Sequence, residues 1–154
     1  MSIKDLKLDK NSDGISDGIF DISFKNGDFA LTGGLETSFM MTIFCQKRED
    51  SIEDPRSRGG WIGNELNEDG FEQGSLVWTL YQEKLDDDTV NICQNYLEDA
   101  FQWYIDRGIA KEIDIVVKKN IDLQKLSATI TAIRNDNTEF VQYYDLWINT
   151  INAS

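Results

Sequence analysis

Residues 86–108, DDDTVNICQNYLEDAFQWYIDRG, carry the strongest helical pattern of this 154-residue chain. Acidic residues open the stretch, where they favour the positive end of a helix dipole, and Gly108 follows its last periodic position. Apolar side chains recur every three or four residues between these ends, which places them on one stripe of a helix. The stripe consists of Val90, Cys93, Leu97, Ala100, Phe101 and Tyr104. We predict a helix that buries this stripe in the core.

After this helix the apolar period falls from about four residues to two. Apolar and polar side chains alternate in residues 112–117, 126–133 and 139–148, as they do in half-buried strands. The turn signal RNDN separates the second stretch from the third. We predict three antiparallel strands in a meander, and because helices precede this terminal sheet, the predicted fold class is α+β.

Three further elements are predicted before the long helix. Residues 19–32 indicate a β-hairpin, because IFDISF alternates, KNGD contains an Asn-Gly turn signal and FALT follows. Residues 35–47 have helical spacing over about three turns, and residues 75–84 indicate a short helix. The expected fold is therefore an N-terminal β-hairpin, two to three helices and a C-terminal three-stranded antiparallel sheet.

Two irregular regions complete a predicted single domain over residues 1–154. The first is an acidic N-terminal turn at residues 1–18. The second is a loop at residues 48–74, which is rich in Asp, Glu, Asn, Gly and Ser and contains the sole proline. Loops longer than about 15 residues are uncommon unless they are functional or disordered, so the loop at 48–74 is a candidate functional region.

The charge balance argues against nucleic acid and membranes as partners. The chain has 28 Asp and Glu against 15 Lys and Arg, a net charge of −13 that repels phosphate and anionic lipid. No apolar run approaches the roughly 20 residues that span a bilayer. We expect a soluble protein that is made in a cytoplasm.

The residue types also restrict chemistry. The chain has no histidine, which removes Ser-His-Asp and Cys-His nucleophiles and metal sites with histidine ligands. Cys45 and Cys93 are too few for a four-cysteine zinc site, and we predict that both are reduced core thiols. Catalysis by two carboxylates, as in a glycosidase, stays open, but no pair of acids is singled out and we predict no catalytic residues.

The N-terminal stretch DKNSDGISD, residues 9–17, has the spacing of a calcium-binding turn. The candidate ligands are Asp9, Asn11, Asp13, Asp17 and the carbonyl of Ile15. The spacing resembles the short Asp-rich turns of thrombospondin-type repeats, and Phe20 stands where an EF-hand has its bidentate glutamate. A plain acidic turn is the alternative. Ca²⁺ is the one candidate cofactor.

The stretch EDPRSRGGWIGNE, residues 53–65, concentrates residue types that dominate protein interfaces. Arginines can form bidentate pairs with carboxylates, and glycines let two backbones approach closely. The candidate partner-binding residues are Arg56, Arg58, Gly59, Gly60, Trp61 and Gly63. In the alternative, the loop folds back on its own domain, Trp61 fills the core and the arginines pair with the chain's own acids.

A second candidate partner-binding surface lies on the last strand. Val141, Tyr143 and Trp147 make its second face apolar, which a sheet with one solvated face does not need. Either the segment 75–84 covers this face within the chain, or a neighbouring subunit does.

Several segments together resemble the small baseplate proteins of Mu-like contractile-tailed phages. In order these are GLETSFMMTIF, RGGWIG, GSLVW, a long helix ending in WYIDRGIA and strands ending in YYDLW. The resemblance covers residues 19–148. Such proteins are similar in role to sheath-initiator wedge proteins, which carry a Glu-Pro-Arg core, and Glu53, Pro55 and Arg56 resemble that core with Asp54 inserted.

The resemblance implies a structural component of a phage-type contractile-tail baseplate that helps to join wedge proteins and to initiate sheath assembly. Its implied partners are other baseplate wedge proteins and the sheath protein, within an oligomeric particle. The protein would be in the cytoplasm of the producing cell during assembly and then in a virion or tail-like particle. Two alternatives stay open, a calcium-binding protein-interaction module and a carboxylate-dependent glycosidase.

Overall fold

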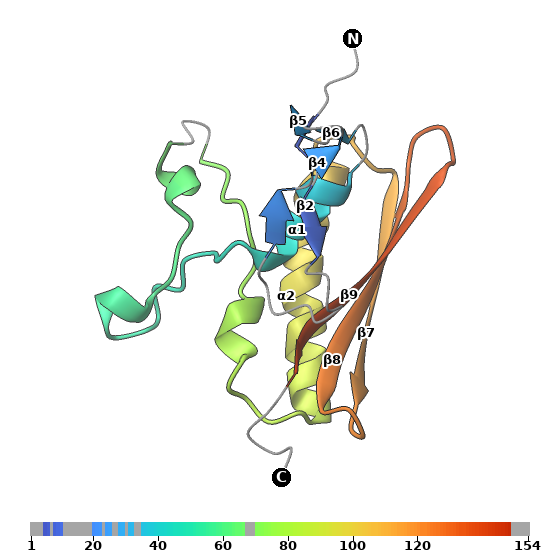
Figure 1. Cartoon of the computed structure of the whole chain (residues 1–154). Coiled ribbons are helices and arrows are strands. Elements are labelled where there is room, and N and C mark those ends of the chain that lie inside the picture. Colours follow the sequence, from blue (N-terminus) through green and yellow to red (C-terminus); the bar gives the residue numbers. More distant parts are fainter. Residues whose placement is uncertain are drawn as a thin grey trace.

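The structure is a computed structural model that describes residues 35–66 and 70–146 in full (Figure 1). It also describes the backbone of residues 147–148 and of six short strands near the N-terminus. These strands are β1 (Asp5–Leu6), β2 (Leu8–Lys10), β3 (Phe20–Ile22), β4 (Phe24–Lys25), β5 (Asp28–Phe29) and β6 (Leu31–Thr32). They pair antiparallel as β1 with β6, β2 with β3 and β4 with β5. Residues 26–27 lie outside the described residues, so the hairpin over 19–32 stays a prediction.

Two α-helices form where the apolar spacing predicts them, α1 (Glu36–Phe44) and α2 (Asp87–Asp106). Asp86 caps α2, because its Oδ1 accepts a hydrogen bond of 2.9 Å from the backbone N–H of Thr89. Gly108 lies past the other end with φ of +70°, a conformation that favours glycine. Neither helix combines the length and the apolar character needed to cross a membrane.

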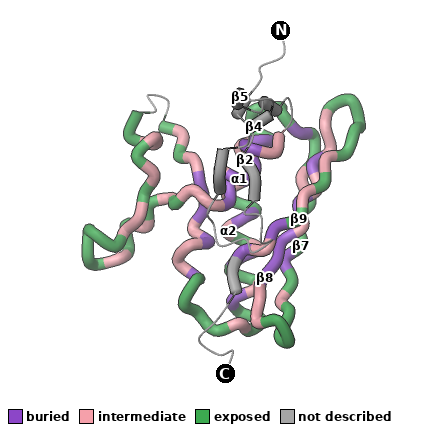
Figure 2. The backbone as a smooth tube through the Cα atoms, in the orientation of Figure 1, coloured by how far each residue is buried: buried purple, intermediate pink, exposed green. Residues whose placement is uncertain are grey.

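The predicted meander is confirmed as β7 (Glu112–Asn120), β8 (Lys125–Ile133) and β9 (Glu139–Ile148). The strands are antiparallel in the order β7-β8-β9. A bulge in β9 places Leu146 between the two residues that pair with Leu126 and Ser127, and Leu146 is buried. The helices lie on one face of the sheet, where the buried residues gather (Figures 1 and 2).

Phe39 joins the layers of the core. Its ring makes edge-to-face contacts with Phe101 and Tyr104 of α2 and with Phe140 of β9, at centroid distances of 4.9, 5.2 and 5.2 Å. Phe39 itself comes from α1 and is fully buried. One side chain therefore packs both helices against the sheet.

Between α1 and α2, the described residues form three short 3₁₀ helices: η1 (Pro55–Ser57), η2 (Ile62–Leu66) and η3 (Val77–Leu80). The helix predicted over 75–84 is thus a single 3₁₀ turn, with Val77 and Leu80 buried. This segment packs against α1 and α2 on the side away from the sheet (Figure 1). The prediction that it covers the outer face of β9 is therefore wrong.

Candidate partner-binding surfaces

The two ends of the loop at 48–74 are joined beside the end of α1. The N–H of Lys47 donates to the Ser75 carbonyl, and the N–H of Ser75 donates to the Cys45 carbonyl, both at 3.0 Å. The Ser75 hydroxyl also donates to the Ile43 carbonyl at 2.6 Å. Gly74 has φ of +115°, and a Cβ there would collide with the Cys45 carbonyl. The loop therefore begins and ends at the same place, beside the C-terminal end of α1.

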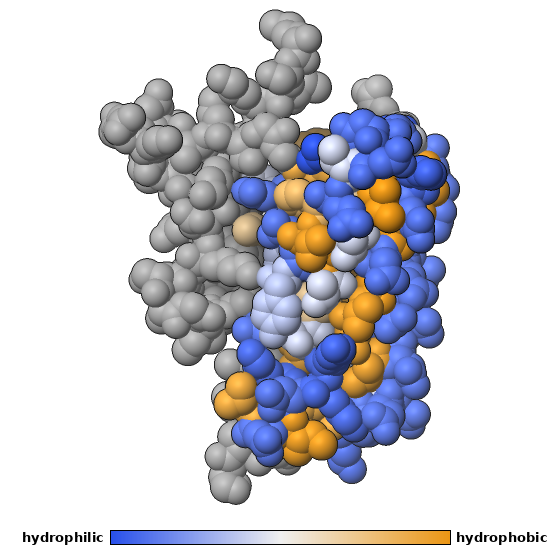
Figure 3. All heavy atoms as spheres, turned by 90° about the vertical axis from the view of Figure 1, so that its right-hand side faces the viewer, coloured by the Kyte–Doolittle hydropathy of each residue, from blue (hydrophilic) through white to orange (hydrophobic). Residues whose placement is uncertain are grey.

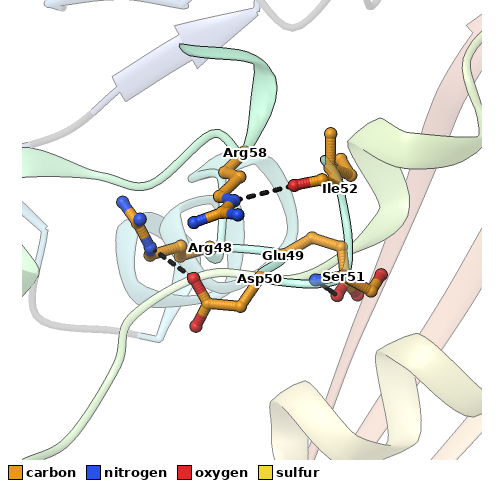
Figure 4. A network of polar contacts seen from close by, with 6 residues as sticks. All are labelled: Arg48, Glu49, Asp50, Ser51, Ile52 and Arg58. Atoms are coloured by element: carbon orange, nitrogen blue, oxygen red, sulfur yellow. Dashed lines mark hydrogen bonds and ion pairs between the residues drawn. The ribbon is translucent and has the colours of Figure 1, made fainter. Parts of the chain in front are cut away.

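Arg58 holds the first half of this loop in shape (Figure 4). Its Nε donates to the Ile52 carbonyl at 2.7 Å, and its own carbonyl accepts from the N–H of Glu49 at 2.8 Å. Arg48 pairs with Asp50 at 2.7 Å. Arg58 thus satisfies a backbone carbonyl, whereas the internal alternative predicted that it pairs with an acid.

Asp54, the residue inserted in the Glu-Pro-Arg pattern, caps η1. Its carboxylate accepts from the backbone N–H of Arg56 at 3.0 Å and from the Ser57 hydroxyl at 3.1 Å. Pro55 begins the turn, where its missing N–H costs nothing. The Arg56 side chain is left exposed, and no ion pair involves it within the described part of the chain.

Gly59 lies against the indole ring of Trp78. It has φ of +66°, and a Cβ at this position would lie 2.6 Å from Trp78 Cζ2. The Trp78 Nε1–H donates to the Lys47 carbonyl at 2.9 Å, which fixes the ring. The RGG segment (58–60) and the GSLVW segment (74–78) therefore meet in space.

Asn64 fixes the second half of the loop. Its Nδ2 donates to the Gln73 carbonyl at 3.0 Å, and its Oδ1 accepts from the Gln73 N–H at 2.7 Å. The N–H of Asn64 donates to the Trp61 carbonyl at 2.9 Å, and the Trp61 ring lies directly over Gly63. Trp61 is half-buried within the loop and lies outside the core. The internal alternative, in which Trp61 fills the core, is wrong on this point.

A chain of hydrogen bonds connects this loop to the core. The side-chain amide of Gln73 donates to Thr42 Oγ1 at 3.1 Å, and that hydroxyl donates to the Ser38 carbonyl at 2.8 Å. Because its proton is used there, Thr42 Oγ1 accepts from the hydroxyl of Tyr104, 3.1 Å away. Burial raises the pKa of Tyr104, and its hydrogen bonds with Ser38 and Thr42 offset part of this rise.

The loop encloses a pocket of about 360 Å³, which we call the loop pocket. Its lining residues are Arg48, Gly59, Gly60, Trp61, Ile62, Asn64, Glu65 and Glu72. On η2, Ile62 and Leu66 are 76% and 80% exposed. Neither residue was predicted from the sequence to bind a partner, and the one signal for them is their spacing of four positions in a polar loop.

The outer face of the sheet forms a second surface. Val141 and Tyr143 are 51% and 48% exposed, and Val116 of β7 is also exposed. Thr129 of β8 pairs with both Val116 and Tyr143, so the side chains of Val116, Thr129 and Tyr143 form one row across the sheet. Apolar residues on this face lie among hydrophilic ones (Figure 3). We call Val116, Thr129, Val141 and Tyr143 the sheet surface. The side chain of Trp147 lies outside the described residues.

The predicted partner-binding residues therefore fall into two groups. The loop projects from one side of α2, at the left of Figure 1, and the sheet lies on the other side of that helix. The first group, in the loop, consists of Arg56, Arg58, Gly59, Gly60, Trp61 and Gly63, and the second, on β9, consists of Val141 and Tyr143, with Trp147 described by its backbone alone.

The calcium prediction falls outside these surfaces. The side chains of Asp9, Asn11, Asp13, Ile15 and Asp17 are not among the described ones, so the calcium site stays a prediction. Within residues 35–66 and 70–146, no three Cys, Asp or Glu side chains are placed to hold a metal ion. Cys45 and Cys93 are free thiols. Cys93 is buried in the core, as predicted, whereas Cys45 is half-buried and lies outside the core.

Comparisons with known proteins agree with the resemblance seen in the sequence. A family model described as "Phage protein GP46" matches residues 35–139. The Mu-like prophage FluMu protein gp46 of Haemophilus influenzae is 33% identical over 86 residues, which cover 56% of this chain and 58% of that relative. The baseplate protein gp46 of Escherichia phage Mu is 27% identical over 104 residues, which cover 65% and 70%. The family model includes α1, α2 and the whole loop at 48–74.

Proposed function

The chain belongs to the phage protein GP46 family, and from this we propose that it is a structural component of a phage-type contractile-tail baseplate. The name of the phage Mu relative, a baseplate protein, supports this role. The same relative supports the expectation of a structural protein and not an enzyme, and the absence of histidine from the sequence agrees with it.

Within the baseplate, the proposed role is to join wedge proteins and to help initiate the sheath. The observation that supports this role is the position of the two candidate surfaces on opposite sides of α2 (Figure 1). A subunit that joins two neighbours needs two separate surfaces, since one surface can hold one partner at a time. The loop would contact a wedge protein, and the sheet surface would contact the sheath protein or a second wedge subunit.

The residues of the loop differ in what they would contribute to such a contact. Arg56 is exposed at η1 and available to a carboxylate of a partner. The Arg58 Nε–H is already bonded to the Ile52 carbonyl, and Gly59 packs against the ring of Trp78. We therefore assign direct contact to Arg56 and the positioning of the loop to Arg58 and Gly59.

Co-expression with the sheath protein and with each wedge protein of the same tail gene cluster tests the role. Arg56→Ala should weaken the wedge complex by about 2 kcal/mol if Arg56 is a hot spot, and leave the sheath complex intact. Tyr143→Lys should do the reverse. Size-exclusion chromatography and native mass spectrometry read out both complexes, and Ile121→Ser, an exposed change in the β7–β8 turn, is the control.

The proposal fails if the unchanged protein binds none of these subunits. It also fails if the loop variant and the sheet variant lose the same partner, because the two surfaces would then not be separate. In purified particles, the protein should be detected by immunoblotting, in agreement with a location in the cytoplasm during assembly and afterwards in the virion or tail-like particle.

A further inference from the structure

We propose that the loop pocket receives an arginine or lysine side chain of a partner protein, while Ile62 and Leu66 contact an apolar patch beside that side chain. The inference deepens the proposed function and rests on it for the source of the partner, a neighbouring baseplate subunit. It assigns a binding site and the chemistry of the group that fills it.

The size of the pocket suits a side chain. Its volume of about 360 Å³ lies at the lower end of the roughly 300–1,000 Å³ typical of ligand pockets. Gly59 and Gly60 form part of its wall, so that the backbone itself is accessible there. One long side chain fits such a space.

The charge of the pocket favours a cation. Glu65 and Glu72 line it, and both side chains are exposed. Among the described lining residues Arg48 is the one cation, and its charge is matched by Asp50 at 2.7 Å. The charges of the two glutamates therefore attract a positive group. The net charge of −13 on the chain also attracts a basic partner from a distance.

Trp61 adds a second source of affinity for a cation. It lines the pocket, and its ring packs against Gly63. An arginine or lysine is attracted to the negative face of a tryptophan ring, and the attraction grows as the cation is desolvated. Aromatic and carboxylate groups in one pocket are the combination that recognises a guanidinium or ammonium group.

The pocket is built before the partner arrives. Asn64, another lining residue, binds both backbone polar groups of Gln73, at 2.7 and 3.0 Å. Gln73 is in turn bound to Thr42 of α1. A wall that is already ordered loses little conformational entropy on binding, so more of the contact energy is retained as affinity.

Ile62 and Leu66 identify what surrounds the cation on the partner. Both side chains are more than three-quarters exposed on one 3₁₀ turn, and Ile62 also lines the pocket. Apolar side chains presented on an ordered turn, next to a polar pocket, match the arrangement of an apolar contact beside a charged anchor. The partner surface is therefore a basic side chain next to an apolar patch.

The first experiment uses the isolated protein and needs no partner. Amide chemical shifts are followed by NMR during titration with N-acetyl-arginine amide, with N-acetyl-citrulline amide as the uncharged control of the same shape. We expect shifts at residues 59–65 and 72 with arginine but not with citrulline, and none with arginine in Glu65→Gln/Glu72→Gln. Equal shifts with both compounds, or no shifts at these residues, overturn the proposal.

The second experiment uses the complex with a wedge protein. Its Kd should rise as NaCl is increased from about 50 mM to about 500 mM, and Glu65→Gln/Glu72→Gln should remove most of this dependence. Ile62→Ser/Leu66→Ser should weaken binding by about tenfold or more at every salt concentration. The matched control, Ile121→Ser/Leu123→Ser, changes two exposed apolar side chains in the β7–β8 turn and should have no effect.

The two experiments separate this inference from the proposed function. If the protein binds a wedge subunit and all three double variants bind as tightly as the unchanged chain, the inference is wrong and the proposed function stands. If no subunit binds but the arginine compound still shifts the pocket residues, the proposed function is wrong and the cation site stands.

Discussion

Replacing Asn64 with alanine tests whether the loop is an ordered platform. The amide of Asn64 makes two hydrogen bonds to the backbone of Gln73, one as donor at 3.0 Å and one as acceptor at 2.7 Å. Each such bond contributes about 1 kcal/mol net. Asn64→Ala therefore lowers the free energy of local loop opening by about 2 kcal/mol, which is about a 30-fold change in the opening equilibrium.

Amide hydrogen exchange measures this opening residue by residue. In Asn64→Ala, the N–H of Gln73 should exchange about 30-fold faster, because the lost Oδ1 was its acceptor. The backbone N–H of residue 64, which donates to the Trp61 carbonyl, should lose protection as well. Amides of α2 such as that of Leu97 should be unchanged, since the core does not contain the loop.

Asn135→Ala is the matched control for this experiment. The Asn135 amide donates to the Gly108 carbonyl at 2.8 Å, in a turn far along the chain from the loop. It should leave the exchange of Gln73 as it is in the unchanged protein. Unaltered protection of Gln73 in Asn64→Ala would refute the reasoning, because the loop would then owe its order to other contacts.

Three further changes test other parts of the structure. Gly59→Ala places a Cβ 2.6 Å from the Trp78 ring at φ of +66°, so it should displace the loop and change the Trp78 fluorescence without unfolding the helices. Burial raises the pKa of Cys93 from 9.0 to about 12, so the unfolded chain loses this proton at a lower pH than the folded protein does. The free energy of unfolding should therefore fall as the pH rises above 9. In Cys93→Ala, chemical denaturation should show a smaller fall of this free energy over the same pH range. The hydrogen bond from the Thr89 N–H lowers the pKa of Asp86, which contributes stability above its ordinary pKa of 3.8 that is lost as the pH falls; the Tm of Asp86→Ala should be lower at neutral pH and approach that of the unchanged protein in acid.

Long periodic segments made most of the fold predictable. The stripe in α2 and the alternation in β7, β8 and β9 each repeat over several turns or pleats, so local pattern and tertiary burial agree. The segment 75–84 was less predictable, because a tertiary tether decides it. Ser75 is bound to Cys45 and Ile43, and this holds the following residues beside α1 as one 3₁₀ turn.

The candidate site was predictable in composition but not in the role of each residue. Arg58 and Gly59 are in the loop that the sequence singled out, yet their positions depend on Ile52 and Trp78, which no local pattern connects to them. Ile62 and Leu66 were missed because their spacing of four positions occurs once, and a single repeat does not establish a helical period. Their exposure becomes informative only when the surrounding turn is known to be ordered.

The packing between the two surfaces explains how a small domain could hold two partners at a fixed separation. From the loop, hydrogen bonds run through Gln73 and Thr42 to Tyr104 of α2. The ring of Tyr104 packs against Phe39, which also contacts Phe140 on β9. Val141 of the sheet surface is the next residue along that strand. Close-packed cores transmit strain with little compression, so a displacement of the loop relative to the sheet requires at least one contact in this series to break. A joint that must keep two subunits in register is best served by such a connection, with the variable contacts confined to the exposed side chains at either end.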